Sequence, residues 1–150
     1  MKSEPETFSI EHLRRAPAQT TVWDGVRNYQ ARNLLRDEMA VGDGVLFYHS
    51  SADPPGVAGT AEVARGGYPD ASQFDPKSDH YDADARREEP RWYMVDIKLG
   101  QVFPRLVGLP ELRENPALSD MVLLRKGSRL SVQPVTAKEW NVIVKLGTGH

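Results

Sequence analysis

One stretch, TTVWDGVRNYQARN from Thr20 to Asn33, constrains the fold of this chain more than any other. It begins with β-branched and aromatic residues typical of a strand, turns at Asp24-Gly25, and enters a helix near Asn28. Trp23, Arg27 and Asn28 are therefore predicted to gather around one bend, where they can hold a planar, hydrogen-bonding ligand. The alternative is a structural role for each: core residue, salt-bridged surface residue and helix cap.

The size and composition of the chain narrow its class. Its 150 residues suit one domain, and we expect a single unit over residues 1–150. It has no apolar run of roughly eighteen residues and no charged-then-apolar leader, so we expect a soluble, intracellular protein without a membrane partner, cytoplasmic or, in a eukaryote, nuclear. The absence of cysteine excludes disulfides and thiolate metal sites.

The charge pattern limits how this chain can bind nucleic acid. A formal net charge of -2 argues against binding mainly by phosphate neutralisation, which needs clustered Lys and Arg. Any such binding is therefore expected to be local. Several arginines can form one basic face. Equally, they can be the ordinary charges of solvated helix surfaces. The residues concerned are Arg14, Arg15, Arg27, Arg32 and Arg36.

The first half of the chain predicts alternating helices and strands. Residues 2–5 end a short first strand, and Ser9 caps a helix over residues 10–16. A second helix is predicted over 28–39, where apolar residues recur at helical spacing. Strands follow at 45–49, apolar enough to be buried on both faces, and at 57–63, where Gly59 indicates a close neighbour, more readily another strand than a ligand.

The second half is less regular. Residues 65–90 read as a long loop, and strands are predicted at 92–99, at 102–107 with a break at Pro104, and at 128–135. Short helical turns are expected at 110–115 and 118–121. Thr136 and Glu139 form a capping box that starts a terminal helix, with Trp140 on its buried side.

Catalytic and metal-binding patterns are weak in this sequence. The acidic residues of the loop lack the glycine and terminal glutamate of a calcium loop, the histidines lack metal-ligand spacing, and no phosphate, dinucleotide or nucleophile-elbow motif occurs. Adjacent His49 and Ser50 point to opposite faces of a strand and cannot form a dyad. Glu4 and Asp24 can act as paired carboxylates, but serve equally to accept hydrogen bonds from a base or to hold Arg27. We expect no cofactor and no metal.

A family resemblance covers nearly the whole chain. The motifs that carry it occur in order: KSEPETFSIEHL, TTVWDGVRNYQARN, LFYHSS, PPGVAGTAEV, YPDASQFDPKSDHYD, RWYMVDIKL and RLSVQPVTAKEW. Together they resemble the EVE domain. The resemblance implies an α+β, PUA-like fold related to the YTH readers, with a mixed, strongly curved sheet or pseudo-barrel flanked by several helices.

The resemblance also implies a function. We expect a non-catalytic, monomeric reader that encloses a flipped base, such as a methylated or otherwise modified cytosine or adenine of DNA or RNA. An enzyme acting on modified nucleotides and a protein-interaction module, with other proteins as partners, are the alternatives. In the expected pocket, Trp23, or Trp92 across the cleft, supplies the aromatic wall, with Tyr48 as a further candidate. Asn28, Ser50 and the backbone near Ser3 read the polar edge, and Lys2 and Arg27 meet the phosphate. The long loop is expected to fold over the pocket with Phe74, Asp75 and Pro76 as its lip; the other expected pocket residues are Glu4, Asp24, Val26 and His49.

Overall fold

The computed structural model of this protein describes residues 1–125 and 130–149. Its centre is one mixed sheet in the order β1-β3-β4-β5-β2. Strand β1 pairs parallel to β3, and all other pairs are antiparallel. The sheet has two edges, β1 and β2, so the predicted mixed α+β architecture is confirmed in its open form and not as a closed barrel. The strands are β1 (Lys2–Ser3), β2 (Thr20–Trp23), β3 (Gly44–His49), β4 (Gly56–Pro69) and β5 (Tyr93–Gly108).

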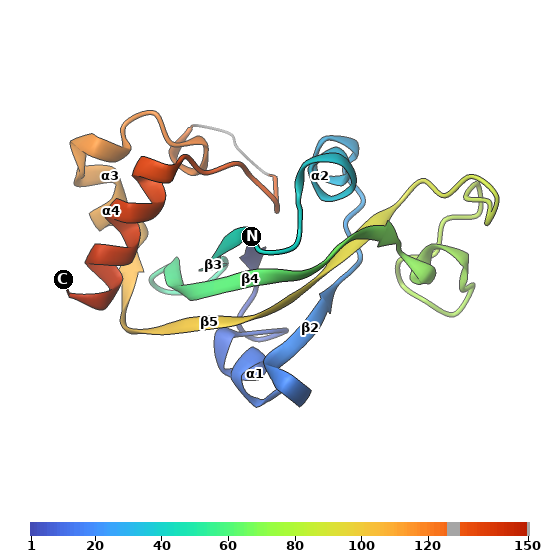
Figure 1. The fold of residues 1–150 in the computed structure, drawn as a ribbon, viewed down its shortest axis with the longest axis horizontal. Helices are drawn as coiled ribbons and strands as arrows, with labels where there is room; N and C mark the ends of the chain where they lie inside the picture. Colours follow the sequence, from blue (N-terminus) through green and yellow to red (C-terminus); the bar gives the residue numbers. More distant parts are fainter. Residues whose placement is uncertain (126–129, 150) are drawn as a thin grey trace.

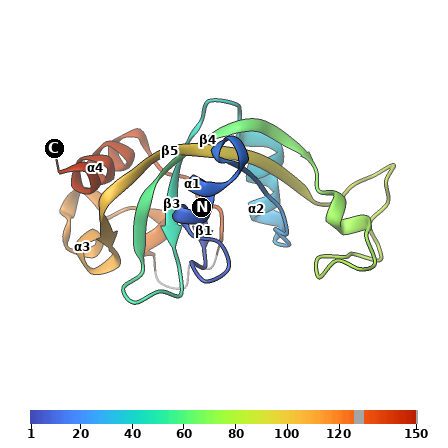
Figure 2. The same ribbon diagram turned by 90° about the horizontal axis from the view of Figure 1, so that it is seen from below.

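The two longest strands form a hairpin that crosses the molecule. Figures 1 and 2 show α3 and α4 at one end of β4 and β5, and the connecting segment 70–92 at the other. Four register shifts interrupt the β4–β5 pairing, and such bulges bend and twist a hairpin.

The helices are α1 (Ile10–Arg15), α2 (Tyr29–Asn33), which continues as a π-helical turn (Leu34–Glu38), α3 (Leu109–Glu114) and α4 (Ala137–Thr148). Short 3-10 turns occur at Pro17–Gln19, Ala71–Phe74, Pro116–Leu118 and Val122–Leu124.

Strand β3 divides the core into two clusters. Val45 and Phe47 pack with α1, α2 and the middle of the β4–β5 hairpin, whereas Leu46 and Tyr48 pack with α3 and α4. The prediction that this strand is buried on both faces is confirmed. Because alternate side chains of a strand point to opposite faces, this single strand links both halves of the core.

Local signals placed the helix starts correctly. Ser9 and Thr136 both cap their helices in capping boxes, and Asn28 caps α2. Trp140, on α4, is partly buried against the second cluster, as its helical position predicts. Capping depends on residues three positions apart, so sequence alone reveals it.

Three strand predictions are wrong in their extent. Strand β4 continues to Pro69, because residues 65–69 still pair with β5. Strand β5 runs unbroken through Pro104, which lies where the paired residues jump from Val102 to Val107 and so has no partner to which it must donate. Of the strand predicted at 128–135, residues 128 and 129 lie outside the described part, and 130–135 form no strand; Pro134 cannot donate to a ladder.

Gly59 shows why a strand interior here needs glycine. A Cβ on this residue would lie 2.2 Å from the carbonyl oxygen of Gln101 on β5 and 2.4 Å from Cδ1 of Ile10 on α1. The close neighbour predicted from the sequence is therefore a strand, together with a helix. Gly59→Ala is expected to lower the free energy of unfolding by about 1–3 kcal/mol through overpacking. In denaturant titrations, Gly66→Ala in the same strand is the control, since its added Cβ would make only a 3.8 Å contact; equal stability of the two variants would contradict the prediction.

Candidate functional site

A cleft opens where β1, the bend after β2 and the start of α2 meet. Its volume is about 490 Å³, within the range of small-molecule sites. It is lined by Lys2, Ser3, Glu4, Thr7, Trp23, Asp24, Gly25, Val26, Arg27, Asn28, His80 and Ser131. The predicted bend therefore forms one wall of a real cleft.

Trp23 joins the cleft to the core. Its ring meets that of Phe47 edge-on, with centroids 5.7 Å apart and an interplanar angle of 88°. Phe47 is fully buried, whereas Trp23 stays partly exposed. The indole is thus anchored by the hydrophobic interior while part of it remains available to a ligand.

Asn28 presents an oriented amide to the cleft. As the N-cap of α2, its Oδ1 accepts hydrogen bonds from the backbone N–H of Gln30 at 2.9 Å and of Ala31 at 3.1 Å. This capping role identifies which amide atom is oxygen. The Nδ2 group, which has no acceptor within residues 1–125 and 130–149, is left as a donor at the cleft wall.

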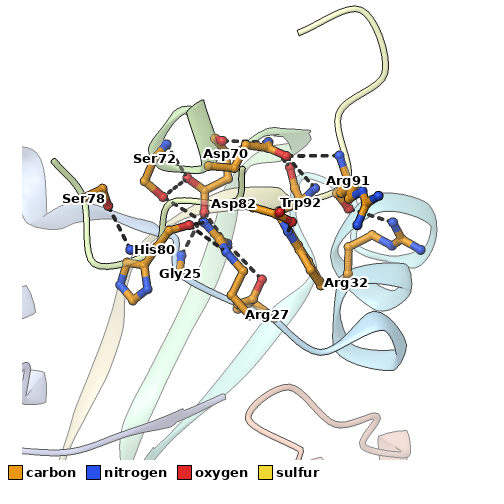
Figure 3. Close-up of polar contacts among 12 residues, drawn as sticks. Gly25, Arg27, Arg32, Asp70, Ser72, Ser78, His80, Asp82, Arg91 and Trp92 are labelled. Atoms are coloured by element: carbon orange, nitrogen blue, oxygen red, sulfur yellow. Dashed lines mark hydrogen bonds and ion pairs between the residues drawn. The ribbon is translucent and has the colours of Figure 1, made fainter. Parts of the chain in front are cut away.

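Arg27 is a clamp between the bend and the long loop (Figure 3). Its Nε donates to the carbonyl of His80 at 3.1 Å, and one terminal nitrogen donates to the same carbonyl at 2.6 Å and to Ser72 Oγ at 3.1 Å. The other donates to Val26 O at 3.0 Å and to Asp70 Oδ2 at 3.1 Å. A guanidinium has five N–H donors, and these contacts use all of them. In this arrangement Arg27 has no donor left for a phosphate, so we drop that role.

Asp70 is the buried end of the clamp. Its side chain is 1% exposed and accepts hydrogen bonds from the backbone N–H of Gly25 at 2.8 Å, from the N–H and hydroxyl of Ser72 at 2.9 and 2.5 Å, and from Arg27. Burial by itself raises the pKa of this carboxyl, but the hydrogen bonds from Ser72, Gly25 and Arg27 outweigh it and hold the pKa below its usual value. Asp70 therefore ties segment 70–92 to the bend as a carboxylate.

This lowered pKa predicts a pH dependence of stability. A carboxyl with a depressed folded-state pKa stabilises the fold above its unfolded pKa of about 3.9, and that stabilisation is lost as the pH falls through the lower folded value. We expect the free-energy difference between wild type and Asp70→Asn to be constant from about pH 7 to 5 and to shrink towards pH 3. Chemical denaturation at each pH measures it; a difference that stays unchanged in acid would contradict the prediction.

Trp92 supports the clamp from outside the cleft. It is 6% exposed, its Nε1 donates to Asp82 Oδ2 at 2.7 Å, and its ring stacks on Tyr29 with centroids 4.9 Å apart. The guanidinium of Arg27 lies 5.4 Å from its ring centroid. The hydrogen bond from Trp92 lowers the pKa of the Asp82 carboxyl. Trp92 therefore does not line the cleft, because Tyr29 of α2 and Arg27 contact its ring and Asp82 accepts its N–H.

The residues at the end of β3 that were expected in the pocket, and Ser50 directly after it, lie elsewhere. Tyr48 is 7% exposed in the second core cluster, where burial raises the pKa of its hydroxyl. His49 Nε2 accepts the N–H of Ile10 at 3.1 Å, and burial lowers the pKa of its imidazole. Ser50 donates its backbone N–H to Ser3 at 2.9 Å. Since none of the three lines the cleft, we drop them from the candidate site.

The expected lip is also displaced along the loop. Phe74 lies under the guanidinium of Arg87 at 4.9 Å, Asp75 Oδ1 accepts the N–H of Lys77, and exposed Pro76 follows; none lines the cleft. His80 is the residue of segment 70–92 that does. Sequence reasoning also missed Thr7 and Ser131. The turn at Asp24-Gly25 was predicted, and Gly25 has a positive φ of 76°, but no local pattern identifies His80 as the residue that packs on it.

The remaining predicted residues stay at the cleft. Lys2 and Ser3 come from β1, and burial lowers the pKa of the Lys2 amine. Glu4 and Asp24 are exposed carboxylates on the lining. Together with the Asn28 amide they provide both acceptors and a donor for a polar ligand edge.

Two features are absent from the described residues. No three His, Asp or Glu side chains of 1–125 and 130–149 gather closely enough to hold a metal ion. No helix in this part of the chain has the length and apolar character needed to cross a bilayer.

An open mixed sheet flanked by helices, with a cleft where β2 meets α2, defines this protein as a PUA-like α+β domain, the architecture of its structural neighbours. More narrowly, the chain belongs to the EVE domain family, whose model matches residues 1–146.

Known relatives agree with this assignment. Zebrafish (Danio rerio) thymocyte nuclear protein 1 is 42% identical over 97% of this chain and 70% of its own length. A crystal structure of a protein from Pseudomonas putida is 49% identical, with a TM-score of 0.90 over 97% of this chain and 96% of that one. The crystal structure of human THYN1 protein in complex with 5-methylcytosine-containing DNA is 41% identical, with a TM-score of 0.91 over 98% of this chain and 95% of that one.

Proposed function

We propose that this protein is a non-catalytic nucleic-acid-binding domain that takes one modified cytosine out of its stack and encloses it in the cleft. The observation that carries the proposal is the pairing of a partly exposed, core-anchored indole with an oriented amide donor, Trp23 and Asn28, on one wall of the cleft. The human relative solved with 5-methylcytosine-containing DNA supports the same ligand class.

The lining chemistry suits a cytosine. The exocyclic amino group of cytosine is a donor for which Asp and Glu are good acceptors, and Glu4 and Asp24 offer exposed carboxylates. The ring nitrogen and carbonyl of the same base edge are acceptors, for which the Nδ2 group of Asn28 is a donor. An adenine also presents a donor next to an acceptor, so the modification and the fit decide between the two.

The energy balance requires these polar contacts. Stacking on an aromatic side chain contributes about 1–3 kcal/mol per base, and unstacking the base costs a few kcal/mol. A methyl group adds only about 0.8 kcal/mol of apolar burial, roughly fourfold in affinity. Val26, 6% exposed, is the aliphatic side chain of the lining and the expected contact for such a methyl group.

The test is a panel of short DNA and RNA oligonucleotides carrying cytosine, 5-methylcytosine, adenine or N6-methyladenine. Binding is measured at about 50 and about 200 mM salt, because phosphate-driven binding falls steeply over this range. We expect preference for the modified cytosine at both concentrations. Absence of binding to every oligonucleotide, or binding indifferent to modification, would overturn the proposal.

A cap-preserving variant tests the amide itself. Serine caps a helix as well as asparagine does, so Asn28→Ser keeps α2 intact while removing Nδ2. We expect a loss of about 5- to 150-fold in affinity for the modified oligonucleotide, since the base acceptor is left unpaired. The control is Asn115→Ser, because Asn115 caps a 3-10 turn in the same way outside the cleft. Equal affinity of the two variants would remove Asn28 from the site.

A further inference from the structure

His80 is the residue that segment 70–92 contributes to the cleft, and its imidazole is unused. The side chain is exposed, and its ring nitrogens have no hydrogen-bond partner within the described chain. Figure 3 shows the ring beside Gly25, turned away from the polar cluster around Asp70. A ring that is exposed and still carries two free nitrogens can donate to a ligand at the mouth of the cleft.

Three contacts hold His80 in this place. The guanidinium of Arg27 donates two hydrogen bonds to its carbonyl, at 2.6 and 3.1 Å. Its backbone N–H donates to Ser78 Oγ at 3.1 Å. Its ring packs so closely on Gly25 that a Cβ there would lie 2.6 Å from Nε2. An exposed loop residue is thus fixed on the bend that carries Trp23.

The fixation depends on Asp70, which does not line the cleft. Asp70 binds both Gly25, on which the His80 ring packs, and Arg27, which donates to the His80 carbonyl. It accepts the N–H of Gly25 and a terminal N–H of Arg27. Its carboxylate is buried and multiply bonded, so it sets where Arg27, and through Arg27 the His80 carbonyl, can lie. Any effect of Asp70 on a ligand in the cleft must therefore pass through these neighbours.

From this geometry we propose that His80 donates a hydrogen bond to the phosphate that flanks the enclosed base, and that Asp70 is the positioning residue that holds His80 there. The inference rests on the proposed function. A phosphate is the expected partner because the base of an extruded nucleotide fills the interior of a cleft while its phosphates stay at the mouth, where the His80 ring is exposed. With all five donors of Arg27 occupied by the protein, His80 supplies the contact for which Arg27 is unavailable.

The test measures binding of an oligonucleotide with one 5-methylcytosine, and of a second in which neutral methylphosphonate linkages flank that base. His80→Ala is expected to weaken binding to the first by about 3- to 10-fold, the effect of one hydrogen bond. His80→Gln retains an N–H donor and is expected to recover part of the loss. With the methylphosphonate oligonucleotide, wild type and His80→Ala are expected to bind alike.

A double-mutant cycle tests the positioning role. Asp70→Asn is expected to weaken binding by a similar factor, and the double variant by no more than the larger single effect, since residues in one network are not additive. Circular dichroism establishes that each variant is folded at the assay temperature. If the Asp70→Asn protein is unfolded, Ser72→Ala takes its place in the cycle, because it removes a single uncharged acceptor of Arg27. Arg105→Ala, in the exposed ion pair with Glu111 away from the cleft, is the control.

The outcomes separate this inference from the proposed function. Unchanged binding by His80→Ala together with weakened binding by Asn28→Ser would overturn the inference and leave the function standing. An equal His80→Ala loss with the methylphosphonate oligonucleotide would overturn the phosphate contact, and additive losses in the cycle would overturn the positioning role of Asp70. A wild-type protein that binds no oligonucleotide would refute the function itself, and the inference with it.

Discussion

Trp23→Ala is expected to weaken binding of the modified oligonucleotide by about 5- to 150-fold, the equivalent of one lost base–aromatic stack of about 1–3 kcal/mol. The ring is the largest aromatic surface on the cleft lining. Its edge-on contact with Phe47 fixes its orientation before a ligand arrives, so the base does not have to order it. Fluorescence anisotropy with a labelled oligonucleotide measures the change.

Two controls separate stacking from folding. Trp23→Phe keeps a ring on Phe47 and is expected to retain most of the binding. Trp140→Ala removes another partly buried indole, which packs against the second core cluster and outside the cleft; it is expected to lower stability without changing affinity in the folded protein. A folded Trp23→Ala protein with wild-type affinity would refute the stacking role.

Gln73→Ala is expected to lower the free energy of unfolding by at least about 2 kcal/mol, or roughly 4–8 °C in Tm for a chain of this size. Gln73 is fully buried. Its Nε2 donates to the carbonyls of Asp70 at 2.7 Å and Trp92 at 2.8 Å, and its Oε1 accepts the backbone N–H groups of Arg91 and Trp92, both at 3.0 Å. Alanine leaves the N–H groups of Arg91 and Trp92 without partners, whereas the carbonyls of Asp70 and Trp92 still accept from the backbone N–H groups of Gln73 and Asp70. An unsatisfied buried group costs about 1–3 kcal/mol.

Calorimetry measures the loss, and hydrogen exchange locates it. The amides of Arg91 and Trp92 are expected to lose protection first, because they donate directly to the missing oxygen. Gln101→Ala, at an exposed position of β5, is the control and is expected to stay within about 0.5 kcal/mol of wild type. A Gln73→Ala protein as stable as this control would show that segment 70–92 does not depend on the buried amide.

The conformation of the long segment between β4 and β5 could not be predicted from the sequence. Its composition predicted a loop, but its conformation depends on polar contacts between residues far apart, such as Trp92 with Asp82 and Gln73 with both ends of the segment. Because Asp82 and Trp92 sit in irregular backbone and Gln73 in a single 3-10 turn, no periodic pattern reveals the pairs. The lip was therefore predicted near Phe74, when the cleft residue is His80.

Of the three aromatic residues predicted to line the pocket, only Trp23 lies on the cleft, and the reason is similar. Trp23 ends a strand and precedes a turn, so its place at the bend can be predicted from its neighbours. Trp92 and Tyr48 have equally favourable composition, but their environments are set by which helices and loops cover them. The alternation of β3 predicts that Tyr48 faces opposite to Phe47, and only the packing of α3 and α4 decides that this side is a second core.

The sequence by itself determined the helix caps, the turn at Gly25, the doubly buried β3 strand and the family, because each depends on residues close together in the chain or on motifs in order. The tertiary structure decided that the guanidinium of Arg27 donates to His80, Ser72 and Asp70, and that His80 lies on Gly25. Those contacts join positions 43 or more residues apart. They require the bulged β4–β5 hairpin, which places segment 70–92 beside the bend, and that hairpin geometry is set by long-range pairing that local sequence does not encode.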